Sequence, residues 1–214
     1  MNFLQKHLTK DVPVRFGFYF LGLLILTLGI ALSIVSQLGA SPFDALLVGL
    51  YNNFGFTVGS WEYILGAIML LINSAVQRKK VDLKAMVTAV ITGFGIDFWL
   101  FVLTNTWEPK IMLGRLIVFI LGILLIGLGI AAYLQADFAP SPLDATMLVI
   151  QKYFGVKISI AKNIMMFFFL ILAIIFKGPI ALGTLIMVLA GGPAVGWFLP
   201  RMEALKKHGD TVTR

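Results

Sequence analysis

The sequence contains several apolar runs about as long as a bilayer is thick. Four of them carry few or no charges, at residues 16–36, 86–104, 111–136 and 164–176. Because a helix needs about 20 apolar residues to cross a hydrocarbon core of roughly 30 Å, most of these runs are long enough to span it. With 59% apolar residues among 214, the chain is predicted to be an integral membrane protein.

Composition and motifs argue against several classes of function. The net charge of +7 comes from Lys and Arg clusters between apolar runs, a pattern typical of membrane topology rather than of nucleic-acid binding. The chain has no Cys, its two His residues lie in the polar ends, and no Gly-x-x-x-x-Gly-Lys phosphate loop occurs. We therefore expect no metal site, no cofactor and no enzymatic activity.

Two segments, 41–45 and 141–145, both read Ser-Pro-x-Asp-Ala, and each interrupts an apolar run. At the same offset of 100, residues 15–55 match residues 115–155 at 14 of 41 positions, and the matches include Arg, Gly, Ser, Pro and Asp. Apolar composition alone would not align residues of these types. The chain is therefore predicted to be a tandem duplication.

The duplication divides the chain into an arm at 1–13, repeat 1 at 14–104, a linker at 105–110, repeat 2 at 111–199 and a tail at 200–214. Each repeat is predicted to hold three spans and one short helix. The expected helices are 14–36, 43–54, 61–76 and 83–104 in repeat 1, and 111–136, 143–154, 158–176 and 180–199 in repeat 2. Each short helix would be about 18 Å long, too short to span, so we expect it to be re-entrant.

The positive charges indicate a topology for this arrangement. With six spans, 14 of the 17 Lys and Arg residues fall on the cytoplasmic side together with both termini, and three (Lys110, Arg115 and Lys177) fall outside. With eight spans the division is 12 and five, so six spans fit better. Because three crossings is an odd number, the second repeat would enter the membrane from the opposite side. The predicted fold is an all-α bundle of two inverted repeats, as in many secondary transporters.

The Ser-Pro-x-Asp element has two compatible interpretations. Ser41 and Ser141 can act as N-caps, with proline at the first helical position and Asp44 or Asp144 at the third, as in a capping box. Alternatively, the two helix ends form polar sites inside the membrane, where the serines and carboxylates bind a solute. The element is thus both a cap and a candidate substrate site.

Asp97 lies in an apolar helix, 14 residues after its predicted start. Placing an ionised carboxylate at that depth in the membrane costs about 2.5–3.5 kcal/mol of free energy. We therefore expect Asp97 to face a cavity, to bond to a neighbouring group or to be protonated. Asp97 is the candidate coupling site, with a structural hydrogen bond as the alternative. Glu62, Gln37 and Asp137 are weaker candidates that line a pathway or face water.

Three further features occur together with the Ser-Pro-x-Asp elements: Gly39-Ala40 before the first element, Pro140 before the second, and the pairs Gly183-Thr184 and Gly192-Pro193 near the end. Through this combination the sequence resembles the bacterial YczE/YyaS/YitT group of membrane proteins. The resemblance covers nearly the whole chain between the polar ends, although Lys84-Ala85 stands where such proteins often have Gly-Thr in the first repeat. It implies residence in a bacterial plasma membrane and a transport role without a named substrate.

The sequence favours a small secondary transporter of an unidentified solute, with proton coupling as one form. Two alternatives stay open: a substrate-binding membrane subunit of an ATP-driven uptake system, and a non-transporting regulator or scaffold. The expected partners are the lipid bilayer and a small-molecule solute, with a homodimer as one assembly, and no nucleic acid.

Overall fold

The computed structural model describes residues 12–106, 109–136, 138 and 140–212, and it is all-helical within them. The helices begin and end close to the predicted residues because the proline, glycine and serine signals of the sequence act locally. They are α2 (Val12–Val35), α3 (Pro42–Phe54), α4 (Val58–Gln77), α5 (Leu83–Thr106), α6 (Met112–Leu134), α7 (Pro142–Phe154), α8 (Ile158–Ile175) and α9 (Leu182–Val212).

Two predicted helix boundaries are wrong. The helix expected to start at Trp61 begins at Val58, because Thr57 is its N-cap and the hydroxyl of Thr57 accepts a hydrogen bond from Ser60 N. The last helix, expected to end before Pro200, continues to Val212 with Pro193 and Pro200 inside it. A proline removes one intrahelical bond, and in a membrane protein neighbouring groups can compensate for that loss.

The two most apolar of the membrane-length helices, α2 and α6, pack against each other in antiparallel directions. Gly22 of α2 lies against Tyr133, and Gly129 of α6 lies against Leu26, so residue numbers rise along one helix as they fall along the other. A side chain at either glycine would collide with the facing backbone. The glycines thus permit the close approach that helices in membranes use for van der Waals packing.

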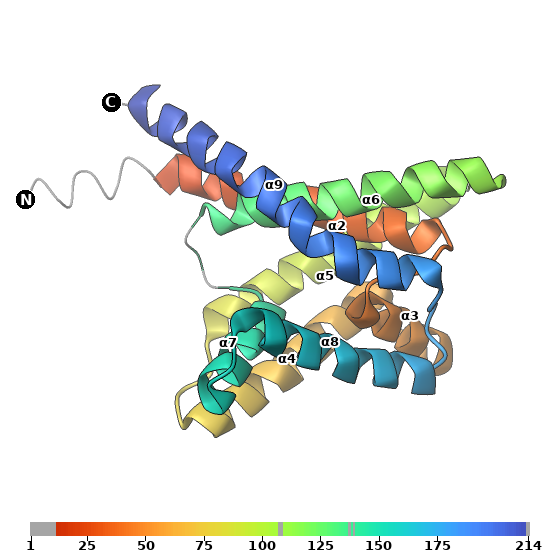
Figure 1. Ribbon diagram of the computed structural model, residues 1–214, viewed down its shortest axis with the longest axis horizontal. Coiled ribbons are helices and arrows are strands. Elements are labelled where there is room, and N and C mark those ends of the chain that lie inside the picture. Colours follow the sequence, from red (N-terminus) through yellow and green to blue (C-terminus); the bar gives the residue numbers. More distant parts are fainter. Residues whose placement is uncertain (1–11, 107–108, 137, 139, 213–214) are drawn as a thin grey trace, which may run out of the picture.

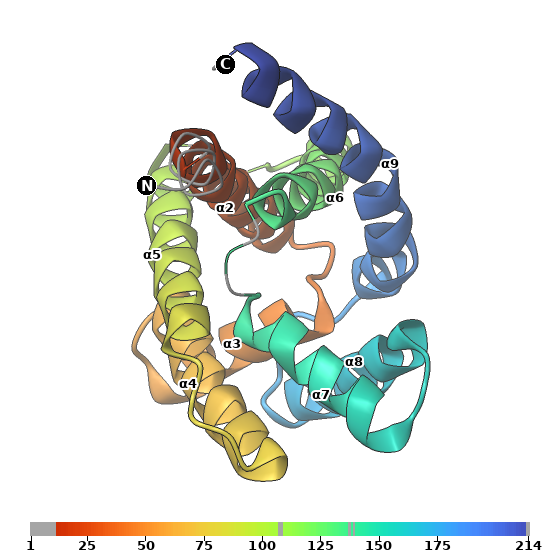
Figure 2. The ribbon, with the colours of Figure 1, turned by 90° about the vertical axis from the view of Figure 1, so that its left-hand side faces the viewer.

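The helices form two groups of four (Figure 2). In the long-helix layer, α5, α2, α6 and α9 lie side by side in that order. In the short-helix layer, α3 packs on α4 and α8, and α7 packs on the same two helices, so the four close into a ring. Its core is apolar, with Phe43 of α3 against Phe169 of α8 at a ring distance of 4.9 Å. The chain passes between the layers four times, and two of these passages are the helix breaks.

The surface of the bundle is apolar over most of its length. Large side chains such as Leu21 of α2 and Phe101 of α5 are 58% and 69% exposed, although both belong to apolar runs. Among the described residues, five helices are long and apolar enough to cross a membrane, namely α2, α4, α5, α6 and α9. The expected sixth span, α8, is a shorter apolar helix. The protein is therefore a membrane protein with several apolar helices whose outer side chains suit lipid.

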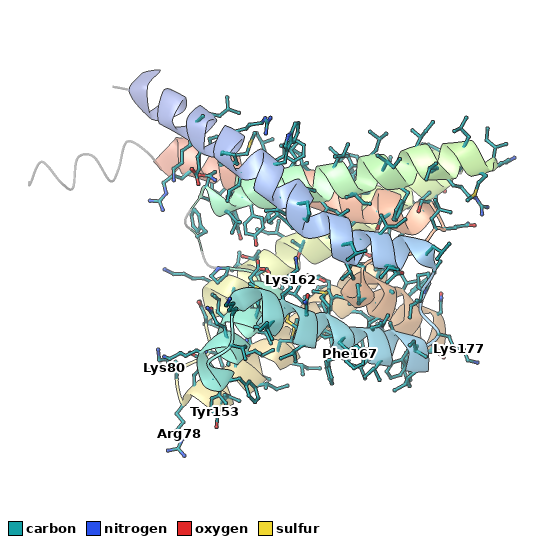
Figure 3. All side chains as sticks on the ribbon, in the orientation of Figure 1. Arg78, Lys80, Tyr153, Lys162, Phe167 and Lys177 are labelled. Carbon is teal, nitrogen blue, oxygen red and sulfur yellow. The ribbon has the colours of Figure 1, made fainter. Side chains whose placement is uncertain are left out.

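Charged loops lie at opposite ends of the bundle. The start of α2 and the end of α9 lie at the same end of the molecule (Figure 1). Arg78 and Lys80, in the connection between α4 and α5, also lie toward that end, whereas Lys177 lies at the other (Figure 3). Lys177 thus lies at the end of the bundle opposite Arg78, Lys80 and the start of α2.

Candidate functional site

The first helix break turns the chain from α2 into α3 over residues 36–41. Gln37 has a φ of 57° and Gly39 a φ of 113°, so two residues of the break have positive φ angles. Only glycine suits residue 39, because a side chain there would also collide with Thr184 of α9. Gln37 is exposed rather than directed into the protein.

Ser41 caps α3 as predicted, since its hydroxyl oxygen accepts a hydrogen bond from Asp44 N at 3.2 Å. The same hydroxyl donates to Asp44 Oδ2 at 2.6 Å. The capping-box prediction is wrong in one respect, because the Asp44 carboxylate bonds the serine side chain and not the backbone N–H of Ser41. Asp44 is only 6% exposed, so the first break buries a carboxylate that one hydroxyl holds.

The second break repeats this geometry at α7. Ser141 accepts a hydrogen bond from Asp144 N at 3.2 Å and donates to Asp144 Oδ2 at 2.9 Å. The Tyr133 hydroxyl of α6 is a second donor to the same carboxylate oxygen. Asp144 is half-buried and therefore more accessible than Asp44. The repeats thus place the same cap at both breaks, but only the second has a tyrosine.

Glu62 lies next to the first break. It is half-buried in α4, accepts a hydrogen bond from Thr92 Oγ1 at 3.2 Å, and lies close enough to Asp44 for the two carboxylates to repel each other. The expectation of a water-facing acid at the membrane boundary therefore does not describe its position. Glu62 and Asp44 thus lie on two packed helices of the short-helix layer, within range of each other's charge.

Asp97 lies beside the start of α4. Its Oδ2 accepts a hydrogen bond from the Thr57 hydroxyl at 2.5 Å, and its Oδ1 accepts one from Gly59 N at 2.8 Å. Thr57 is the N-cap of α4, and Gly59 lies in its first turn, whose N–H groups have no partner inside the helix. Gly59 and Gly93 allow this approach, since a side chain at either would collide with the carbonyl oxygen of the other. This geometry is the one expected if Asp97 has a structural role, namely a hydrogen bond to a neighbouring helix, instead of a coupling role.

Several polar residues near the breaks carry no sequence signal of a site. The Tyr19 and Thr88 hydroxyls lie 2.7 Å apart between α2 and α5, and Asn73 of α4 donates to Thr146 of α7 at 2.9 Å. Single hydroxyls and amides in apolar helices match no motif, so only the folded arrangement reveals them. Asp137 lies outside the described residues. Among the residues that the structure describes, no group of three or more His, Cys, Asp or Glu side chains could hold a metal ion.

Comparisons with known proteins agree on a family. Residues 13–200 match the model of a family of unknown function, DUF6198. The chain is 48% identical over 190 residues to the "Uncharacterized protein YyaS" of Bacillus subtilis, covering 89% of this chain and 94% of that protein. It is 34% identical over 202 residues to the "Uncharacterized membrane protein YczE" of the same organism, covering 93% and 92% of the two chains. No solved structure matches significantly.

Proposed function

The chain belongs to the family of unknown function DUF6198, and from the geometry of its two helix breaks we propose that it is a secondary transporter of a small solute. The observation that carries the proposal is the pair of Ser-capped helix starts, each with a carboxylate held by the serine hydroxyl at 2.6 or 2.9 Å. Discontinuous helices with polar ends at membrane depth form the substrate sites of many secondary transporters.

The packing of the helices supports two inverted repeats. The contact of α2 with α5 corresponds to that of α6 with α9, and the contact of α3 with α8 corresponds to that of α7 with α4. The fourth helices of the two repeats, α5 and α9, align at an offset of 99 instead of 100. Equivalent residues then meet in the first pair of contacts: Gly95 lies against Thr27, and Ala194 lies against Gly127. With α2 and α6 antiparallel, the two breaks would open toward opposite sides of the membrane.

We further propose six crossings with both termini in the cytoplasm of a bacterial cell. The helix α8 would be the sixth, because its 18 residues are about 27 Å long, close to the hydrocarbon thickness. The end of the molecule that holds Arg78 and Lys80 would then be cytoplasmic, and the end that holds Lys177 would be outside.

Two positions are candidates for ion coupling. Asp97 is the one that the sequence favours, and its two hydrogen bonds would have to change on protonation. The pair of Asp44 and Glu62 is the one that the geometry favours, because a cation or proton between two neighbouring carboxylates relieves their repulsion. Asp44 would then serve both solute binding and coupling.

Purified protein can first be screened for solutes that raise its unfolding midpoint, and each hit then tested for uptake into proteoliposomes. Asp44→Asn and Asp144→Asn keep the size of the side chain and the serine cap, and we expect each to lower uptake at least tenfold. Glu203→Gln is the matched control, because Glu203 is an exposed acid in the polar part of α9.

Uptake that is equal in all three variants would contradict a role of the breaks in transport. Binding without uptake, together with co-purification of an ATPase, would favour the ATP-driven alternative. Neither binding nor uptake of any solute would leave the regulator or scaffold as the better assignment.

A further inference from the structure

The contact between the two layers is one-sided. On one side, α5 packs along α4 and also touches α7. On the other side, α9 and α8 share no comparable contact within the described residues, although they are the repeat equivalents of α5 and α4. Every other major contact between helices has an equivalent in the other repeat. The junction of α4 with α5 is therefore closed in this structure, and that of α8 with α9 is open.

The closed junction depends on a small set of groups. Gly59 and Gly93 let the backbones approach, and Asp97 accepts hydrogen bonds from Thr57 and Gly59 across the junction. Farther along the helices, Thr92 of α5 donates to Glu62 of α4. These residues connect the first turns of α4 to the middle of α5.

The junction of α8 with α9 has residues equivalent to those of the closed junction, but it lacks the equivalent contact between the helices. At the offset of 99 that aligns α5 with α9, Gly192 corresponds to Gly93 and Gly196 to Asp97. A side chain added at either glycine of α9 would meet nothing within 4 Å, and both residues are exposed. On α8, Lys157 stands where repeat 1 has Thr57, and it is exposed and makes no side-chain cap bond. A glycine face of α9 is thus uncovered, and repeat 1 indicates that the first turns of α8 can cover it.

The remaining packing allows such a closure without unfolding. The helix α9 stays attached to α6 through Ala194 on Gly127, and α8 stays in the ring of the short-helix layer. Only the four connections between the layers have to bend, and three of them already contain residues in the left-handed conformation, namely Gln37, Gly39, Arg78 and Lys177. Hinges of this kind consist of a few residues at the ends of elements.

We propose that the short-helix layer rocks between α5 and α9, an inference that rests on the proposed transport function. In the second state α8 packs on the Gly192–Gly196 face of α9, and the bonds of Asp97 to the first turn of α4 are broken. The helix breaks between the layers are then reached from the opposite side of the membrane, as alternating access requires. The carboxylate of Asp97 acts in this scheme as a latch of the closed junction.

Pairwise cysteine cross-linking can test this, because the chain has no Cys of its own. The full-length protein in native membranes would carry Lys157→Cys with Gly196→Cys, and cross-linking would be started with a short thiol reagent. We expect this pair to cross-link slowly, because the second state, in which α8 packs on α9, would be populated only part of the time. Adding Asp97→Ala should release the latch and raise the rate at least fivefold.

The control pair is Asn73→Cys with Thr146→Cys, whose side chains lie within one layer and in contact in this structure. Its cross-linking rate should be fast and insensitive to Asp97→Ala. The proposal is overturned if the control pair reacts while the Lys157/Gly196 pair does not exceed the single-cysteine variants, or if Asp97→Ala leaves the rate of that pair unchanged.

Cross-linking uses no solute, so its result is independent of the transport assay. If the Lys157/Gly196 pair responds as expected and no solute is transported, the rocking motion stands and the transporter assignment fails. If a solute is transported and the pair never forms, the transporter stands and the rocking motion fails.

Discussion

Replacing Asp97 tests whether its carboxylate holds α4 against α5. Its Oδ2 accepts one hydrogen bond from the Thr57 hydroxyl at 2.5 Å, and its Oδ1 accepts one from Gly59 N at 2.8 Å. A capping bond contributes about 0.5–2 kcal/mol, and a side-chain bond inside a membrane protein about 0.6 kcal/mol. Asp97→Ala removes both and should cost about 2 kcal/mol, which lowers the unfolding midpoint of a chain of this size by about 4–8 °C.

Asp97→Asn should cost much less. Its amide oxygen can still accept from Gly59 N, and its NH2 group can donate to the Thr57 hydroxyl oxygen, so we expect a loss below about 1 kcal/mol, or at most about 2–4 °C. The midpoints can be measured by intrinsic tryptophan fluorescence of the purified protein in detergent. Glu203→Ala, at an exposed acid, is the control and should leave the midpoint unchanged.

Two results would refute this account of Asp97. An unchanged midpoint in Asp97→Ala would mean that the carboxylate does not stabilise the junction. Equal losses in the Ala and Asn variants would mean that the negative charge, and not the hydrogen-bonding geometry, is what matters. Independently, solute uptake that is unchanged and still proton-dependent in Asp97→Asn would exclude this residue as the coupling site.

Three further predictions concern packing and the second break, and the same fluorescence assay measures them. Gly129→Ala puts a methyl group against the backbone of α2 and should lower the free energy of unfolding by about 1–3 kcal/mol. Gly17→Ala, at an open position, should be neutral or stabilise the protein by up to about 1 kcal/mol. Equal effects of the two variants would contradict close packing of α2 and α6. Tyr133→Phe removes one donor from the carboxylate at the second break and should lower the midpoint by about 2–4 °C; no change would mean that this bond is not formed. A double-mutant cycle of Asn73→Ala and Thr146→Val should give a coupling energy of about 0.6 kcal/mol, and zero coupling would contradict the contact of α4 with α7.

The sequence predicts best those features that are determined by interactions between residues close together in the chain. The caps at Ser41 and Ser141 and the short helices behind them follow from serine, proline and aspartate at fixed spacing, and both are confirmed. The start of α4 was less predictable, because Thr57 and Ser60 are both good caps. The tertiary bond of Gly59 N to Asp97 favours the earlier start, and such a bond has no trace in the local pattern.

The site residues depend even more on tertiary structure. Glu62 stands at a helix start beside a tryptophan, which locally indicates a residue facing water at the membrane boundary. It is instead half-buried and within range of the charge of Asp44, because α4 packs on α3 in the short-helix ring. Lys162 stands at the same position of repeat 2, so the duplication does not mark Glu62 as part of a site. The pair is thus an asymmetry that only the folded chain brings together.

The role of the carboxylates at the breaks can be separated from the stability of the breaks. Backbone groups of the first break are bonded elsewhere: Gly183 N donates to Leu38 O at 2.9 Å, and Ala40 N donates to Pro179 O at 3.3 Å. The second break is held by cationic side chains, since Arg15 donates to Ala136 O at 2.9 Å and Lys206 to Gln135 O at 2.6 Å.

In both breaks the serine alone caps the following helix, and the aspartate bonds only side-chain hydroxyls and none of the backbone N–H groups that a capping box would satisfy. Its charge near a helix N-terminus contributes about 0.3–1 kcal/mol, which is small against the cost of burying a carboxylate in the protein, as at Asp44. A purely structural break would therefore be at least as stable with a neutral residue at position 44 or 144. Two carboxylates at equivalent positions therefore favour ligand binding over capping, and Asp44→Asn and Asp144→Asn should lose uptake while keeping the unfolding midpoint.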